Sequence, residues 1–190
     1  GLSTYFSNAF TIDTQRPTAS ILVSDTQLSA GETSMVTITF SEAVTGLTLD
    51  ALNVQGGTLS GLTTSDDITW TAIFTPAANT VRGQVSISLD NSQVADRVGN
   101  IGVGETSSNI FTINTRLPTA TVVVADTAMG IGESSIVTIT FSEQVSGLTL
   151  EALSAEHGTL TNLTSTNGIV WHVTLTPDTN VTDSTNLITL

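Results

Sequence analysis

The residues of this 190-residue chain that could do chemistry are mostly acidic. The chain has 17 Asp and Glu residues against four Arg and no Lys, which gives a formal net charge of −13. Carboxylate and amide oxygens are the ligands that hard cations such as Ca²⁺ prefer in proteins. Such side chains form a site only where the fold gathers them. Four lie in connections between segments that we expect to be strands: Asp13, Glu42, Asp96 and Asn100.

The negative charge also bears on the classes of partner. A surface of this sign repels phosphate backbones and anionic lipids, so we expect no nucleic-acid partner. Apolar stretches such as Ile21-Leu22-Val23 are far too short to cross a bilayer, so we expect no membrane insertion. A second interpretation stays open, in which the acidity serves only to keep an exposed protein soluble.

The elements that would position these residues are repeated. The stretch Phe10–Ala19 returns as Phe111–Ala120, an offset of 101 residues, and the same offset relates roughly half of the positions from Pro17 to Leu89 without a gap. The chain therefore holds two copies of one module in series. Each is long enough to bury its own core, and the absence of cysteine excludes disulfides and thiolate metal sites.

Short segments with alternating apolar residues follow each other along each module. Alternation is clear over residues 34–40 and 68–76, and again over residues 85–89, whereas residues 50–52 could make one helical turn and residues 90–106 read as a polar loop. Seven or so such segments in about 100 residues predict an all-β fold. We expect two tandem immunoglobulin-like antiparallel β-sandwich domains, the second lacking its final strand.

The expected domain limits follow from the repeat. Residues 1–14 align with the last strand of a module, residues 15–115 make the first domain, and residues 116–190 make a second, incomplete one. A sandwich without its last strand exposes its core and unpaired backbone groups.

Residues 1–14 are a candidate for that missing strand. We expect them to complete the open module of a neighbouring copy, head to tail, with Phe6, Phe10 and Ile12 on the face that is buried. The alternative is that both ends are cuts in a longer tandem array. The expected partners are therefore neighbouring copies or modules.

In a sandwich of this type, the junction before the first strand, the loop after the second and the loop before the last all lie at one pole. These positions hold Asp13, Glu42, and Asp96 with Asn100, so we expect them to share a calcium ion that links adjoining modules. The alternative is that Glu42 accepts hydrogen bonds from loop N–H groups while Asp13 and Asp96 cap turns.

Catalysis finds no support in the sequence. The two histidines, His157 and His172, stand where the first copy has Gly56 and Thr71, so the repeat does not depend on them. No Gly-x-Ser-x-Gly elbow and no phosphate-binding glycine loop is present. We expect no enzymatic activity.

Several motifs carry a resemblance to a known family. They are Thr37-Ile38-Thr39-Phe40-Ser41-Glu42, Trp70-Thr71-Ala72-Ile73-Phe74-Thr75-Pro76, Asp96-Arg97-Val98-Gly99-Asn100 and Phe10-Thr11-Ile12-Asp13-Thr14. With these, the chain resembles the bacterial immunoglobulin-like repeats of large surface adhesins and biofilm-associated proteins.

The resemblance implies an extracellular structural role at the bacterial cell surface. In that family such repeats mostly extend a binding domain away from the cell, and calcium commonly stiffens the junctions. The position equivalent to Asp13 in the second copy is Asn114, which has no carboxylate. Calcium binding is therefore not expected to be the same at both junctions. We therefore expect an extender of an adhesin or a subunit of a surface filament. The alternative is an adhesive module that contacts a host or matrix glycan.

Overall fold

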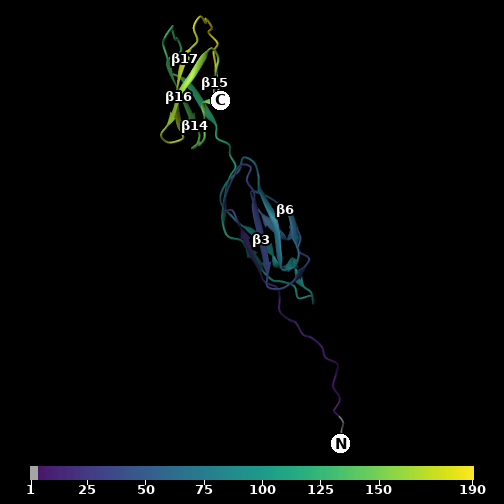
Figure 1. Cartoon of the computed structure of the whole chain (residues 1–190). Coiled ribbons are helices and arrows are strands. Elements are labelled where there is room, and N and C mark those ends of the chain that lie inside the picture. Colours follow the sequence, from purple (N-terminus) through teal and green to yellow (C-terminus); the bar gives the residue numbers. More distant parts are fainter. Residues whose placement is uncertain (1–3) are drawn as a thin grey trace. The chain divides into compact units, whose positions relative to one another are not determined.

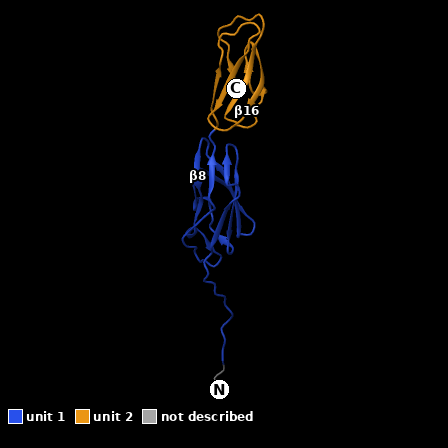
Figure 2. Ribbon diagram, turned by 90° about the vertical axis from the view of Figure 1, so that its left-hand side faces the viewer, with its two compact units in different colours: residues 1–116 blue, residues 117–190 orange. Residues whose placement is uncertain are grey.

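The computed structural model describes residues 4–190 and separates into two compact units, Gly1–Arg116 and Leu117–Leu190 (Figures 1 and 2). Short strands joined by turns make up both units, and the only helices within residues 4–190 are single 3₁₀ turns. The predicted all-β class is confirmed. No helix in this described part of the chain has the length and apolar character needed to span a membrane.

One four-stranded antiparallel sheet forms the first layer of unit 1. The alternation predicted for residues 34–40 is present, since Val36 and Ile38 are fully buried while Met35, just before Val36, is half exposed. The strand over residues 57–64 was not predicted, because its Thr, Ser and Gly residues give little contrast in hydrophobicity between its two faces. In sheet order the strands are β1 (Ala19–Val23), β3 (Ser34–Phe40), β7 (Thr69–Pro76) and the unpredicted β6 (Gly57–Thr64).

Shorter strands make the second layer of unit 1. One group places the last strand, β12, between a parallel and an antiparallel neighbour, in the order β2 (Gln27–Ser29), β12 (Phe111–Asn114) and β8 (Val81–Val85). A second group has the order β11 (Glu105–Ser107), β9 (Ile87–Asp90) and β5 (Leu52–Val54), and a third pairs β10 (Ala95–Asp96) with β4 (Val44–Thr45).

The core of unit 1 lies between these layers. Phe74 of β7 meets Phe111 of β12 edge to face, with ring centroids 5.2 Å apart. Such an aromatic pair contributes about 0.5–1.5 kcal/mol beyond the burial of its area. Trp70 also packs against this core, although it is only partly buried. The last strand is thus a structural part of the core.

The connection predicted as a polar loop, residues 90–106, contains more structure than expected. Asp90 accepts a hydrogen bond from the Ser92 N–H at 3.0 Å and so caps the 3₁₀ turn η2 (Asn91–Gln93). Strand β10 and the start of β11 follow. A second 3₁₀ turn, η1 (Leu49–Ala51), lies within one residue of the predicted helical turn.

Unit 2 repeats the first layer closely and the second only in part. Its four-stranded sheet has the order β13 (Ala120–Val124), β14 (Ser135–Phe141), β17 (Val170–Pro177) and β16 (Gly158–Ser165). After the 3₁₀ turn η3 (Leu150–Ala152), the second layer consists of β15 (Ser154–Ala155) paired with β18 (Ile188–Thr189). Residues 117–190 therefore lack a strand equivalent to β12, as predicted.

The strand expected over residues 1–14 is not formed in residues 4–14, and residues 1–3 lie outside the described part of the chain. The physical reason is the lack of an open edge. A strand needs a neighbour for its backbone groups, and in unit 1 the position that this sequence would occupy is filled by β12.

Candidate cation site at one pole of unit 1

Three carboxylates reach one pole of unit 1 from different connections. Asp96 ends β10, Glu42 follows β3 after Ser41, and Asp13 lies in the segment that leads to β1. This segment is held in place near β3, because the Ser41 N–H donates to the Thr18 carbonyl at 2.9 Å and the Thr18 N–H donates to Ser41 Oγ at 3.0 Å.

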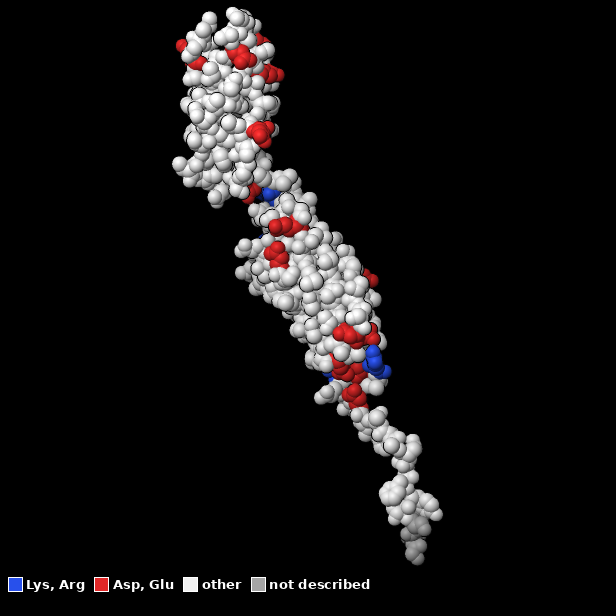
Figure 3. All heavy atoms as spheres, viewed as in Figure 1, with Lys and Arg blue, Asp and Glu red and all other residues white. Residues whose placement is uncertain are grey.

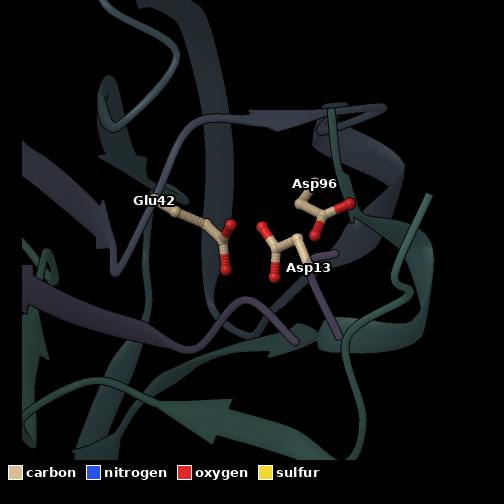
Figure 4. Close-up of side chains that lie close together, drawn as sticks. All are labelled: Asp13, Glu42 and Asp96. Atoms are coloured by element: carbon tan, nitrogen blue, oxygen red, sulfur yellow. The ribbon is translucent and has the colours of Figure 1, made fainter. Parts of the chain in front are cut away.

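The three side chains converge. One carboxylate oxygen from each of Asp13, Glu42 and Asp96 lies within 4.8 Å of the other two. Figure 4 shows the carboxylates pointing toward one another, and Figure 3 shows acidic side chains gathered at the end of unit 1 beside the N-terminal segment. Asp13 is exposed, Glu42 is half-buried and Asp96 is buried. The predicted acidic residues are thus brought together.

The fourth predicted residue, Asn100, ties the cluster together. Its Nδ2 donates to Asp96 Oδ2 at 2.7 Å and to the Asp13 carbonyl oxygen at 3.2 Å. Arg16, three residues after Asp13 and not predicted from the sequence, also ties this segment to unit 1. Its guanidinium donates to the carbonyl oxygen of Ile101 at 2.7 Å.

Asp96 is the rigid member of the cluster. Its Oδ1 accepts hydrogen bonds from the N–H groups of Val98, Gly99 and Asn100 at 2.9, 2.7 and 2.8 Å. Gly99 has a φ of 98°, a conformation that glycine adopts without steric cost. Burial raises the pKa of Asp96, but the hydrogen bonds from Asn100, Gly99 and Val98 together outweigh it and leave this pKa below its ordinary value. Asp96 therefore stays ionised.

Glu42 responds in the opposite direction. Its pKa is raised, first by burial and then by the negative charges of Asp13 and Asp96. Within residues 4–190, no hydrogen bond to the Glu42 carboxylate offsets these effects. The fold therefore holds this side chain beside two like charges, an arrangement that a bound cation would relieve.

The alternative interpretation holds for individual oxygens of Asp13 and Asp96, but within residues 4–190 no loop N–H group donates to the Glu42 carboxylate as that interpretation expected. Asp13 Oδ1 accepts the Gln15 N–H at 3.0 Å, and Asp96 Oδ1 caps its own turn. The remaining carboxylate oxygens and nearby carbonyl groups form an all-oxygen donor set of the kind that Ca²⁺ takes. Arg97 on the neighbouring turn does not neutralise these carboxylates, because its guanidinium pairs with Asp67 at 3.1 Å. A bound cation would supply the positive charge instead. The residues present fit a hard cation.

The side chains predicted to take part in strand addition are exposed to solvent. Phe6, Phe10 and Ile12 have 90%, 74% and 76% of their surface exposed. Apolar side chains of this size are usually buried when a partner is available. Their role in strand addition stays a prediction.

Unit 2 has a cavity of about 590 Å³ that was not predicted from the sequence, lined by residues 127–132 and 177–183 among others. Differences between the two copies of the repeat could have indicated this cavity. His157 lines this cavity where the first copy has Gly56, and the polar residues Thr182 and Asn186 replace Val81 and Val85.

Comparison with known proteins identifies the repeat. A family model described as a bacterial Ig-like domain matches residues 13–113 and again residues 114–190. Both stretches are the units of β-sandwich structure described above, so the predicted immunoglobulin-like fold is confirmed.

Individual relatives are more distant. An S-layer protein of Geobacillus stearothermophilus is 28% identical over 166 residues, which cover 87% of this chain and 12% of that protein. Among solved structures, the Escherichia coli adhesin FdeC matches 90% of this chain and 63% of its own, with a TM-score of 0.48 and 15% identity. The Yersinia pseudotuberculosis adhesin InvE matches 84% of this chain and 51% of its own, with a TM-score of 0.38 and 21% identity. The chain thus spans less than two thirds of each of these relatives.

Proposed function

Because the chain belongs to the bacterial Ig-like domain family, we propose that it is a structural extender of an extracellular adhesin or a subunit of a surface filament. The observation that carries this proposal is the gapless repetition of one sandwich at an offset of 101 residues. A module that is repeated in series adds length with each copy, whereas a catalytic or ligand-binding protein gains nothing from the register of the repeat.

Two further observations support a place at the cell surface. The relative from Geobacillus stearothermophilus is an S-layer protein, and its similarity extends over both modules of this chain. The net charge of −13 keeps a protein with many exposed apolar residues from self-associating without specificity.

Small-angle X-ray scattering tests the extender role. For an extender, we expect the maximum dimension of the chain to equal that of two sandwiches laid end to end. A maximum dimension close to that of a side-by-side pair would contradict the proposal. Antibody labelling of intact cells tests the location, because an extracellular protein is labelled without permeabilising the cells.

The acidic cluster at the pole of unit 1 supports a second proposal, which concerns calcium. We propose that Asp13, Glu42 and Asp96, with Asn100 as their support, bind Ca²⁺. The ion would supply positive charge between three carboxylates that otherwise repel one another. Since Asp13 belongs to the segment that precedes β1, binding would fix that segment on unit 1.

Thermal unfolding with calcium and with excess chelator tests the site. An ion that binds only the folded form must raise the melting temperature of unit 1, by an amount that grows with calcium concentration. The variant Asp13→Asn should lose this increment. The control is Asp50→Asn, which removes one charge from the exposed turn η1 of the same unit and should keep the increment. Equal melting temperatures with calcium and with chelator would contradict the proposal.

We also propose that copies of the chain associate head to tail by strand addition. The exposed Phe6, Phe10 and Ile12 support it, because their burial needs a partner that unit 1 does not supply.

A further inference from the structure

The four-stranded sheet of each unit is free of acidic and basic side chains, apart from one histidine. None of the 17 acidic residues and none of the four Arg residues lies in its strands, which are β1, β3, β6 and β7 in unit 1 and β13, β14, β16 and β17 in unit 2 (Figure 1). The solvent-facing side of an antiparallel sheet is usually polar, and charged residues there keep copies of a protein apart. Such a face is unexpected on a chain with a net charge of −13.

The outer face of this sheet in unit 1 carries an apolar patch. Leu22, Met35 and Ile73 are 59%, 50% and 41% exposed. Met35 of β3 stands opposite Ile73 of β7. Leu22 of β1 stands opposite Thr37, which is the next outward position along β3 from Met35. Direct and diagonal neighbours on one face of a sheet lie about 4.5–8 Å apart, so the three apolar side chains form one continuous patch.

Unit 2 repeats this patch at the same positions. Val123 and Ile136 are the counterparts of Leu22 and Met35, and they are 59% and 48% exposed. The one residue of these four strands that can carry a charge is His172, and it does so only when protonated. Both units therefore present the same kind of surface.

The core does not require these apolar side chains. Val36, next to Met35, is 0% exposed, and alternation along β3 directs Met35 to the opposite face of the sheet. A polar residue at the outward position would leave the buried face unchanged. The two copies differ at roughly half of their positions, yet both keep an aliphatic side chain here. The patch therefore needs an explanation other than folding.

Charge indicates which partner fits the face. Two copies that each carry a charge of −13 repel one another wherever their acidic surfaces meet. Two sheet faces without charged groups can approach without this repulsion and without burying an unpaired charge. A second copy also presents the same face, so a symmetric pair would cover the apolar patch of each chain with that of the other.

We infer that the outer faces of the four-stranded sheets are contact surfaces through which two copies of this chain pack laterally, sheet against sheet. Facing sheets pack about 10 Å apart with interdigitating side chains. This contact goes beyond the proposed extension in series, and it does not involve residues 4–14.

The size of the face sets the strength of this contact. Four strands about 4.8 Å apart, with about seven residues each, cover roughly 400–500 Å². A stable complex buries about 800 Å² on each partner, so a single face supports only weak association. The face of the other unit strengthens the association if both engage the same partner.

Sedimentation velocity in excess chelator, over a range of protein and NaCl concentrations, tests the inference. We expect association to increase with protein concentration. It should also increase as NaCl rises from about 0.05 to 0.5 M, because salt screens the repulsion between the two acidic chains. The chelator removes association that divalent cations mediate at the acidic pole. Association that decreases with salt indicates ion pairs across the contact and overturns the inference.

A paired substitution tests the face directly. Met35→Glu together with Ile136→Glu adds one charge to each face, and it should weaken association at least about tenfold, because like charges would meet in a contact that excludes water. The matched control is Val103→Glu together with Ile131→Glu. These two exposed apolar residues lie outside both four-stranded sheets, so the control adds the same charge and should keep the association.

A charge exchange separates a lost contact from a folding defect. A mixture of the Met35→Glu, Ile136→Glu chain with a Met35→Lys, Ile136→Lys chain should associate more strongly than the glutamate variant alone. Lysines at Val103 and Ile131 should not restore association with the glutamate variant. A monomer at every protein and salt concentration overturns the inference, as does association that Met35→Glu with Ile136→Glu leaves unchanged.

The other proposals are tested separately. Ile12→Asp lies outside both sheets, so lateral association should survive it, whereas strand addition should not. Scattering from the dilute monomer and surface labelling test the extender role whatever the outcome here.

Discussion

The two units carry similar residues and enclose them differently. Val36 and Ile38 of unit 1 are 0% exposed, and so are their counterparts Val137 and Ile139 in unit 2. In the second layer the equality ends. Leu89 is 0% exposed, whereas its counterpart Leu190 is 51% exposed.

The difference shows which part of the sandwich each stretch determines. The four-stranded sheet forms in both units because all four of its strands lie in the part of the repeat that both units contain. The second layer of unit 1 also includes β12, which pairs with both β2 and β8. Within residues 117–190, which contain no counterpart of that strand, the corresponding apolar residues are partly exposed.

Residues 7–14 and 108–115 are nearly identical in sequence but differ in structure. Residues 108–115 contain strand β12, with Phe111 and Ile113 buried, and residues 7–14 form no strand, although six of the eight positions are identical. Strand formation here is decided by the neighbours that accept the hydrogen bonds.

The largest expected effect separates these two segments directly. Phe111→Ala should destabilise unit 1 by about 3–5 kcal/mol, because it opens a cavity beside Phe74. Phe10→Ala, the same substitution in the other segment, should change the stability of the dilute monomer by less than about 0.5 kcal/mol. Urea unfolding measures both. Equal losses would show that residues 7–14 already pack on a core in the monomer.

A smaller effect is expected where the repeat exchanges Gly56 for His157. Gly56→His should cost unit 1 about 1–3 kcal/mol, because its Cβ would lie 2.9 Å from Arg82 Cδ and 3.0 Å from Ile113 Cδ1. The reverse change, His157→Gly, should stabilise unit 2 by up to about 1 kcal/mol, because His157 has a φ of 51°. Thermal unfolding of each variant checks the opposite signs, and a loss in both would contradict the assignment.

The two tryptophans are expected to differ by about 1 kcal/mol in the cost of replacing each with Phe. Trp171 Nε1 donates to the Gly168 carbonyl at 3.1 Å, whereas the buried Trp70 Nε1 has no hydrogen-bond partner among the described residues. Trp171→Phe loses a hydrogen bond, while Trp70→Phe removes an unsatisfied donor. We expect the former to cost about 1 kcal/mol more by chemical denaturation. A larger cost at Trp70 would indicate an additional partner for its indole.

The smallest effect concerns Glu42 and depends on pH. Its pKa is raised in the folded state, so folding favours the protonated form, and the stability from this group is lost as pH rises through that pKa. Glu42→Gln should therefore melt at a higher temperature than the parent in chelator at pH 7. The gap should close as pH falls toward the ordinary value of 4.5. With calcium present the sign should reverse, because the variant loses a ligand. Asp50→Asn serves as the control for charge alone.

Much of this structure could be predicted from the sequence. The alternation over residues 34–40 and 68–76 places apolar side chains on one face, and that pattern alone requires a strand with one buried side. Strand β6 was missed because its Thr, Ser and Gly residues alternate too weakly. The structure within residues 90–106 was missed because a cap such as Asp90 acts through one local hydrogen bond.

For the pole of unit 1, the fold class was enough to predict which acidic residues meet. Asp13, Glu42 and Asp96 converge because three connections of a sandwich end on the same side. The support from Arg16 and the turn at Gly99 could not be foreseen, since both depend on where individual backbone carbonyl and N–H groups point. Calcium binding itself stays a prediction.

The parallel pairing of β2 with β12 has a mechanical consequence. The polypeptide enters unit 1 just before β1 and β2 and leaves it directly after β12. Tension applied through the neighbours of this unit would pull these two parallel strands in opposite directions along their length. Their hydrogen bonds would then resist as a group in shear, rather than opening one after another like a zipper.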